Sequence, residues 1–165
     1  MSAPAAPMSQ IVMSQIVMQT PVGALEIEER DGALTAIDWT EADARDPGDA
    51  RPVLIKAKRQ LDSYFAGKLR EFDLPLSARG SAFRSRVWRA LQDIPFGETR
   101  TYGELAELLG SAPRAVGGAC GANPIAIVIP CHRVVGAGGW LGGYSGGQGI
   151  NTKTSLLEHE RDAAS

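Results

Sequence analysis

The sequence predicts an α+β protein, with a small α/β domain followed by a mainly helical domain that contains a helix-turn-helix. Three observations favour this fold class. Residues 25–39 alternate apolar and polar side chains around a turn signal, as antiparallel strands do. Residues 54–65 repeat apolar side chains at helical spacing, and residues 81–121 contain three further helical segments separated by short breaks. A chain of 165 residues is long enough to bury two small cores.

The first domain is expected to span residues 11–78, after a disordered Ala/Pro-rich tail of residues 1–10. Two strands, residues 25–28 and 33–39, are predicted on either side of the Asp31-Gly32 turn. Their alternation buries one face only, so a covering helix is needed.

Pro52 suits the first position of that helix, and Gly67 suits its end. Phe72, Leu74 and Leu76 alternate with polar residues or proline, which favours a last strand. Nothing in this domain predicts chemistry.

The second domain is expected to span residues 79–165 and to begin with a helix capped by Ser81. Thr101 and Glu104 form a capping-box pattern for the next helix, which Gly110 closes. Pro113 then suits the start of a further helix that ends near residue 121. Two helices joined by so short a turn indicate a helix-turn-helix, and the alternative is an αα-corner that does not bind DNA. A final helix is predicted around residues 150–160.

The predicted helix at 113–121 carries almost no side-chain bulk: Ala115, Gly117, Gly118, Ala119 and Gly121. Each interior glycine costs about 1 kcal/mol relative to alanine, so the pattern needs a reason. One explanation is close approach to a DNA minor groove. The other is tight packing against a neighbouring helix. The sequence alone leaves both open.

Charge is unevenly distributed along the chain. The net charge of −2 argues against a generic nucleic-acid binder. Residues 1–78 hold 8 Lys/Arg and 12 Asp/Glu, whereas residues 79–133 hold 7 Arg and 4 Asp/Glu. Arginine without lysine suits phosphate contacts, because its planar fork binds two oxygens at once.

Several classes of protein are disfavoured by composition. No apolar run approaches the ~20 residues of a membrane span, and no secretory signal is evident. The chain has 2 Cys and 2 His, all in its last third, which is too few for a disulfide framework and leaves little for a zinc site. We expect a cytoplasmic protein without metal, cofactor or membrane partner.

The stretch around Cys131 concentrates the chemistry. An apolar run, residues 127–129, ends at Pro130, which fixes φ and removes a donor, so the chain must bend there. Cys131 and His132 follow at once. A thiolate is the nucleophilic form of cysteine, and His132 is the local candidate base. The alternative is that Cys131 is a small buried hydrophobe.

Four motifs occur in order along the second domain: the run 114–119, Asn123-Pro124, the run 130–134 and the run 144–147. Together they resemble the active-site half of the O6-alkylguanine-DNA alkyltransferases, the methylated-DNA–protein-cysteine methyltransferases. The likeness is close over residues 83–160. It implies a ribonuclease-H-like first domain and a winged-helix-like second domain.

The resemblance also implies the reaction. A monomer would bind duplex DNA through the minor groove, flip out an O6-alkylguanine and transfer the alkyl group irreversibly to Cys131, once per molecule. In the resembled family a histidine and a glutamate activate the cysteine through water, here His132 and Glu160. Glu158 is an alternative to Glu160, because the stretch after Ser145 is about two residues longer than usual.

The remaining roles follow from the same resemblance. Asn123 would brace the turn that carries the cysteine, and Tyr102 would donate its proton to the departing guanine. The substrate pocket would be formed by Tyr102, Val134, Tyr144 and Ser145. Arg114 would be the finger that fills the gap left by the flipped base, on a DNA-binding helix with Ala115, Gly117 and Gly118.

Three other functions compete with alkyl transfer. An alkyltransferase-like module binds lesions without repairing them, but such modules lack the cysteine. A plain helix-turn-helix regulator would not need the bend at Cys131. A Cys–His hydrolase is disfavoured, because adjacent side chains on an extended segment diverge.

Overall fold

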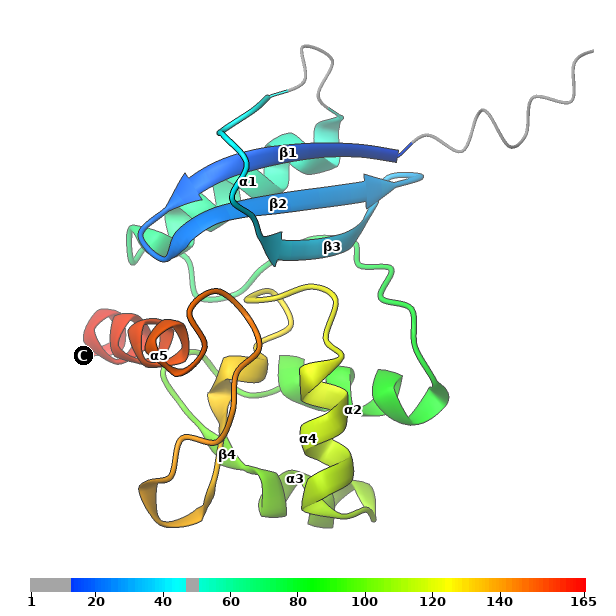
Figure 1. Ribbon diagram of the computed structural model, residues 1–165, viewed down its shortest axis with the longest axis vertical. Coiled ribbons are helices and arrows are strands. Elements are labelled where there is room, and N and C mark those ends of the chain that lie inside the picture. The colour runs from blue at the N-terminus through cyan, green and yellow to red at the C-terminus, as the bar shows by residue number, and fades with distance from the viewer. Residues whose placement is uncertain (1–12, 47–50) are drawn as a thin grey trace, which may run out of the picture.

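The computed structural model describes residues 13–46 and 51–165. The expected tail of residues 1–10 lies outside the described residues. The first part of the chain forms a three-stranded sheet and one helix. Figure 1 shows these elements as one half of the molecule, with the helices of the later part of the chain in the second half.

The sheet consists of β1 (Met13–Thr20), β2 (Gly23–Arg30) and β3 (Ala33–Trp39), paired antiparallel in the order β1-β2-β3. The predicted turn between β2 and β3 is present. Asp31 and Gly32 both have positive φ, 52° and 84°, as a type I′ hairpin turn requires. The two predicted strands are therefore confirmed. β2 extends two residues beyond the predicted range at each end, and β3 has the predicted bounds.

β1 was not predicted. It buries Ile16, Val17 and Met18 in succession, so it lacks the alternation that marks a half-buried strand. Val17 also exchanges two backbone hydrogen bonds, each of 2.9 Å, with Arg45, which pairs with the outer edge of β1.

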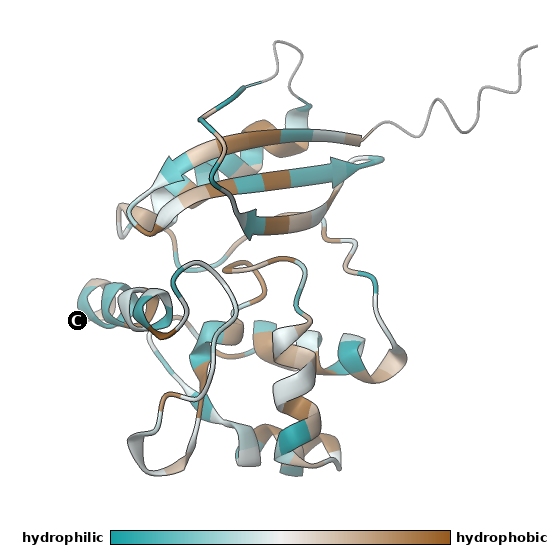
Figure 2. Cartoon of the chain, in the orientation of Figure 1, coloured by the Kyte–Doolittle hydropathy of each residue, from teal (hydrophilic) through white to brown (hydrophobic). Residues whose placement is uncertain are grey.

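Helix α1 (Pro52–Phe65) covers the sheet and starts at its proline, as predicted. Its buried side chains are Val53, Leu54, Ala57, Leu61 and Tyr64. They join the apolar residues of the strands, which form brown segments in Figure 2, in the core of this half.

The predicted last strand at residues 72–76 is wrong. Only a single bridge joins Leu34 to Leu76, where Leu34 donates to the carbonyl of Pro75 and accepts from Ser77, both at 2.8 Å. Pro75 has no N–H to donate, so the ladder cannot extend through it.

The helix starts predicted in the second half are confirmed. Helix α2 (Ala82–Gln92) is capped by Ser81, whose hydroxyl accepts from the third helical N–H. Helix α3 (Tyr102–Leu109) begins with the full capping box of Thr101 and Glu104. Helix α4 (Pro113–Gly121) packs against α2 and α3.

Shorter elements connect these helices to the bend at Cys131. A 3₁₀ turn, η1 (Cys131–Arg133), leads into β5 (Val134–Val135), which pairs in parallel with β4 (Arg100–Thr101). Because α3 starts directly after β4, this pairing brings the beginning of α3 next to the bend. The predicted bend is thus present as a 3₁₀ turn, and Cys131 and His132 do not lie on the extended segment assumed in the argument against a Cys–His hydrolase.

A glycine-rich stretch and one helix complete the chain. The stretch contains a second 3₁₀ turn, η2 (Ala137–Gly139), and the helix is α5 (Ile150–Ala164). Along residues 13–46 and 51–165, no helix has the length and apolar character needed to cross a membrane.

Candidate functional site

The candidate site is a cavity of about 700 Å³ between α3, α4 and the glycine-rich stretch. The structure brings six of the predicted site residues to its wall: Tyr102, Arg114, Gly117, Cys131, Tyr144 and Ser145. The other predicted residues lie behind the wall or on the outer face of α4.

Cys131 is held in place by the turn before it. Its N–H donates to the carbonyl of Ile129 at 2.8 Å. The Asn123 amide donates to the same carbonyl at 2.7 Å and lies 3.2 Å from the Cys131 sulfur, while its oxygen accepts from Ile125 at 3.0 Å. Asn123 thus braces the turn. Within it, Ile127 has a φ of 71°, a strained conformation for a β-branched residue.

The Cys131 thiol is protonated at rest. Its side chain is almost fully buried, and burial raises the pKa of the thiol, although the Asn123 hydrogen bond and the charge of Lys153 oppose that rise. A buried thiol of this kind needs a base to become a nucleophile.

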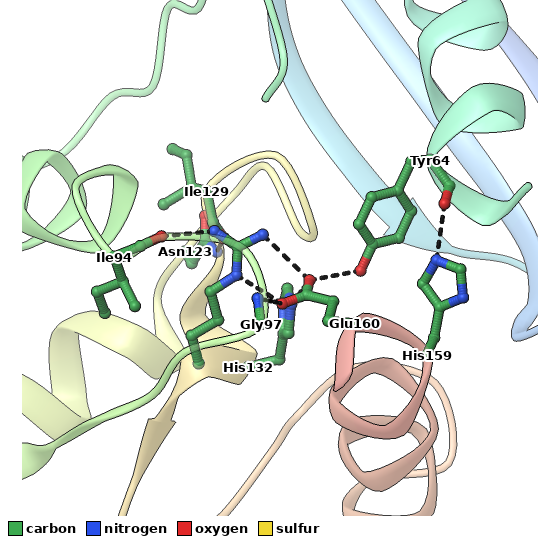
Figure 3. A network of polar contacts seen from close by, with 9 residues as sticks. Tyr64, Ile94, Gly97, Asn123, Ile129, His132, His159 and Glu160 are labelled. Carbon is green, nitrogen blue, oxygen red and sulfur yellow. Dashed lines mark hydrogen bonds and ion pairs between the residues drawn. The ribbon is translucent and has the colours of Figure 1, made fainter. Parts of the chain in front are cut away.

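His132, the residue after Cys131, forms a buried hydrogen-bonded pair with Glu160 of α5 (Figure 3). The His132 Nε2 lies 2.6 Å from Glu160 Oε2, and both side chains are buried. Arg133 contributes two further contacts, with its Nε 2.8 Å from Oε1 and its Nη2 3.1 Å from Oε2. Glu158 is exposed, so the structure selects Glu160 as the carboxylate partner of His132.

The protonation of this pair follows from its surroundings. Burial alone would raise the pKa of Glu160, but the hydrogen bonds and charges of His132 and Arg133 hold that pKa well below its usual range. An ionised carboxylate only accepts, so His132 carries its proton on Nε2. Burial lowers the pKa of His132 despite Glu160, which keeps the ring neutral.

The other ring nitrogen of His132 is therefore a free base. Nδ1 is buried and has no hydrogen-bond partner among the described residues. An unprotonated nitrogen without a partner, on the residue next to Cys131, is what proton removal from the thiol requires.

Lys153 is a site residue that the sequence analysis missed. It is fully buried on α5, and its Nζ lies 3.2 Å from the carbonyl of Gly143 and 3.5 Å from the Tyr102 hydroxyl. Burial lowers the pKa of this amine, and the neighbouring Cys131 opposes the effect. The available signal was a lysine inside the apolar stripe of the final helix, since lysine is rarely fully buried.

Tyr102 lies at the cavity wall. Burial, with smaller contributions from Cys120 and Cys131, raises the pKa of Tyr102 to about 12, so the phenol keeps its proton. A side chain at Gly142 would come within 2.8 Å of the Tyr102 hydroxyl. The glycine therefore permits this position of the ring.

The glycines of α4 do not pack closely against another part of the protein. A Cβ at Gly118 or Gly121 would have nothing within 4 Å, and one at Gly117 would meet only the Tyr102 ring at 4.0 Å. Packing against a neighbouring helix is therefore the wrong explanation for this face. Ala115 and Arg114 are also exposed, so the start of α4 presents one arginine beside a nearly smooth surface.

Two further residues lie close to the site. Cys120, on α4, lines the cavity with Cys131. Burial and the neighbouring Cys131 raise the pKa of Cys120 to about 12, which keeps it an unreactive thiol. His159, on α5, donates from its Nε2 to the carbonyl of Tyr64 at 2.7 Å.

Both halves of the chain match domains of one family of known proteins. Residues 82–162 match the DNA-binding domain of 6-O-methylguanine DNA methyltransferases, and residues 13–78 match the ribonuclease-like domain of the same proteins. The two matches together cover most of the chain. They confirm the predicted α+β fold class.

Individual relatives agree with the domain matches. The methylated-DNA–protein-cysteine methyltransferase of Mycolicibacterium paratuberculosis is 51% identical over 150 residues, which cover 87% of this chain and 90% of the relative. The solved O6-methylguanine methyltransferase of Mycobacterium tuberculosis has a TM-score of 0.81 at 44% identity, covering 93% of this chain and 96% of that one. Another Mycobacterium tuberculosis structure, solved in complex with DNA, has a TM-score of 0.79 at 47% identity and covers 89% and 92% of the two chains. This chain belongs to the O6-methylguanine-DNA methyltransferase family.

Proposed function

We propose that this protein repairs O6-alkylguanine in duplex DNA as a methylated-DNA–protein-cysteine methyltransferase, with Cys131 as the acceptor. One observation carries the proposal. The Cys131 thiol lies at the wall of a cavity that opens beside α3 and α4, and the adjacent His132 presents a buried, unprotonated nitrogen. Family membership supports the choice of this reaction over a lesion-binding module, a regulator or a hydrolase.

The thiol proton leaves first in the proposed reaction. His132 takes it on Nδ1 through a water molecule, and the ionised Glu160 stabilises the imidazolium that forms. The Lys153 cation favours the thiolate, because an opposite charge nearby stabilises the charged form.

Transfer is then a single displacement. The Cys131 sulfur forms a bond to the alkyl carbon while the bond from that carbon to O6 of guanine breaks. The ring gains the electron pair, and Tyr102 donates a proton to N3 so that neutral guanine leaves. The thiol proton held by His132 balances the one that Tyr102 gives up, so overall an alkyl group replaces the proton on sulfur.

The base would be recognised by the groups around the cavity. Backbone carbonyls of Cys131 and Val134 accept from its exocyclic amine, and the Ser145 N–H donates to O6. Tyr144 forms part of the cavity wall, where it packs edge-on against Trp39.

DNA would be bound along α4. The open glycine face allows the backbone of α4 to approach the minor groove closely, with Ala115, Gly117 and Gly118 at the contact. Arg114, exposed at the start of the helix, would enter the stack in place of the flipped base. We expect a monomer to suffice, because one chain supplies all of these groups. A reduced thiol is required, which favours the cytoplasm.

The proposal is tested by mass spectrometry after incubation with duplex DNA that contains one O6-methylguanine. The protein should gain the mass of one methylene, and peptide mapping should place it on Cys131. Cys131→Ser should gain nothing, whereas Cys120→Ser, the matched variant in the same cavity, should still be methylated. A methyl group on Cys120, or none on any cysteine, would refute the assignment.

A further inference from the structure

The N-terminal domain contributes one side chain to the buried network behind Cys131. Tyr64, on α1, is fully buried, and its hydroxyl lies 2.6 Å from Glu160 Oε2 (Figure 3). The two residues are 96 positions apart in the sequence. Because an ionised carboxylate only accepts, the tyrosine donates this hydrogen bond.

Tyr64 shares its acceptor with the candidate base. Oε2 of Glu160 accepts from the Tyr64 hydroxyl and from His132 Nε2, both at 2.6 Å, and from Arg133 Nη2 at 3.1 Å. Oε1 accepts from Arg133 Nε at 2.8 Å and from the Gly97 N–H at 3.4 Å. Hydrogen bonds to a charged group are strong, and each one draws negative charge away from the oxygen that His132 uses.

The ring of Tyr64 cannot move away from this contact. It packs edge-on against Phe65 and Phe96, with ring centroids 4.9 Å and 5.9 Å apart, and lies tilted against Phe72 at 5.5 Å. His159 fixes the backbone of the same residue through the hydrogen bond to its carbonyl. His159 and Glu160, two successive residues of α5, thus both bond to Tyr64 of α1, but only Glu160 also contacts His132.

We propose that Tyr64 is a positioning residue for alkyl transfer, through which the N-terminal domain fixes the orientation and the charge of Glu160 and thereby the basicity of His132. Tyr64 does not line the cavity, so it acts only through Glu160. The inference rests on the proposed role of Cys131, and it gives the N-terminal domain a part in the chemistry.

The expected effect on pH dependence has a definite sign. The charged and titratable groups that face the pair are Arg133 from η1, Lys153 from α5 and Tyr64 from α1. Burial and the Glu160 charge raise the pKa of Tyr64 far above its usual value, so it stays a neutral donor. Removing its hydroxyl concentrates negative charge on Glu160, which stabilises the imidazolium and raises the pKa of His132.

Only neutral His132 can accept the thiol proton. As the pH is lowered, the rate should therefore begin to fall at a higher pH in Tyr64→Phe than in the wild type. We expect the acid limb of the rate profile to move up by about one pH unit. This makes the variant about tenfold slower on the acid side, whereas the two rates should converge on the alkaline side, where His132 is neutral in both proteins.

The experiment measures single-turnover methyl transfer from duplex DNA between about pH 4.5 and about pH 8.5, because burial lowers the pKa of His132 from its usual value of about 6.5. Tyr64→Phe keeps the ring and its packing. His159→Leu is the matched control, because it removes the other hydrogen bond between α1 and α5 without touching Glu160. Both variants should melt at a lower temperature, but only Tyr64→Phe should shift the acid limb.

Superimposable profiles for Tyr64→Phe and the wild type, or equal shifts in both variants, would overturn the inference. A direct NMR titration of His132 in Cys131→Ser and in Cys131→Ser/Tyr64→Phe gives a second test that needs no activity. The pKa of His132 should be higher in the double variant, and an unchanged pKa would also overturn the inference. Methylation of a residue other than Cys131 in the wild type would instead refute the proposed function, and this titration would still decide the role of Tyr64.

Discussion

Replacing Lys153 with methionine should stabilise the fold and slow the reaction. Methionine fills nearly the same volume without a charge. In the wild type the cation is fully buried, and its polar contacts are the carbonyl of Gly143 and the Tyr102 hydroxyl, with no carboxylate paired to it among the described residues. A buried charge compensated only by such contacts is costly.

The stability change can be given a size and a pH window. Relief of about 1 kcal/mol would raise Tm by about 2–4 °C in a protein of this size. Burial lowers the pKa of Lys153 in the folded state, so its penalty applies while the amine is protonated. The gain in Tm should therefore be full near neutral pH and shrink as pH rises toward about 10.4, the unfolded value.

The rate should change in the opposite direction. Loss of the charge removes a hydrogen bond to the proton donor Tyr102 and raises the pKa of Cys131 further. A hydrogen bond to a charged group is worth about 1.5–3 kcal/mol, which corresponds to a rate loss of about tenfold to a hundredfold. Thermal melts and single-turnover transfer on the same preparation provide the assay.

A variant that melts lower and reacts as fast as the wild type would refute this reasoning, because Lys153 would then support packing alone.

Three further variants or forms give independent tests. Arg114→Ala should retain reaction with free O6-benzylguanine but lose most activity on duplex DNA, and an equal fractional loss on both substrates would assign Arg114 to the fold. Tyr102→Phe should slow transfer more than it weakens binding, and unchanged single-turnover rates would remove it from the mechanism. Protein alkylated on Cys131 should melt at a lower temperature if the alkyl group is forced against the buried surroundings of the sulfur, where overpacking costs about 1–3 kcal/mol; an unchanged Tm would show that the cavity accommodates it.

Local rules predicted the helical half of the molecule well. The Thr101–Glu104 box and the Ser81 cap depend on side chains three residues apart, and both are present. The bend at Cys131 followed from Pro130, whose ring restricts the backbone whatever surrounds it. Motif resemblance then indicated His132 and Glu160, which the structure brings within 2.6 Å.

Contacts between distant segments could not be predicted in the same way. The pairing of β4 with β5 involves two residues on each strand, too few to show a pattern. Tyr64 appears in the sequence as one more apolar position of α1, since its hydroxyl has no local partner and meets Glu160 only after both halves fold. Buried polar groups of this kind depend on tertiary contacts, and those are absent from local periodicity.

The most direct test of the account is a titration of a fixed amount of protein with excess duplex DNA containing O6-methylguanine. A thioether has no good leaving group, and a second thiol poised to resolve it is not found: Cys120, the other cysteine at the cavity, is held protonated because burial and Cys131 raise its pKa to about 12. Repair should therefore plateau at one lesion per protein molecule, with the methyl group on Cys131. Continued repair past one equivalent, or a plateau with Cys131 unmodified, would contradict the account.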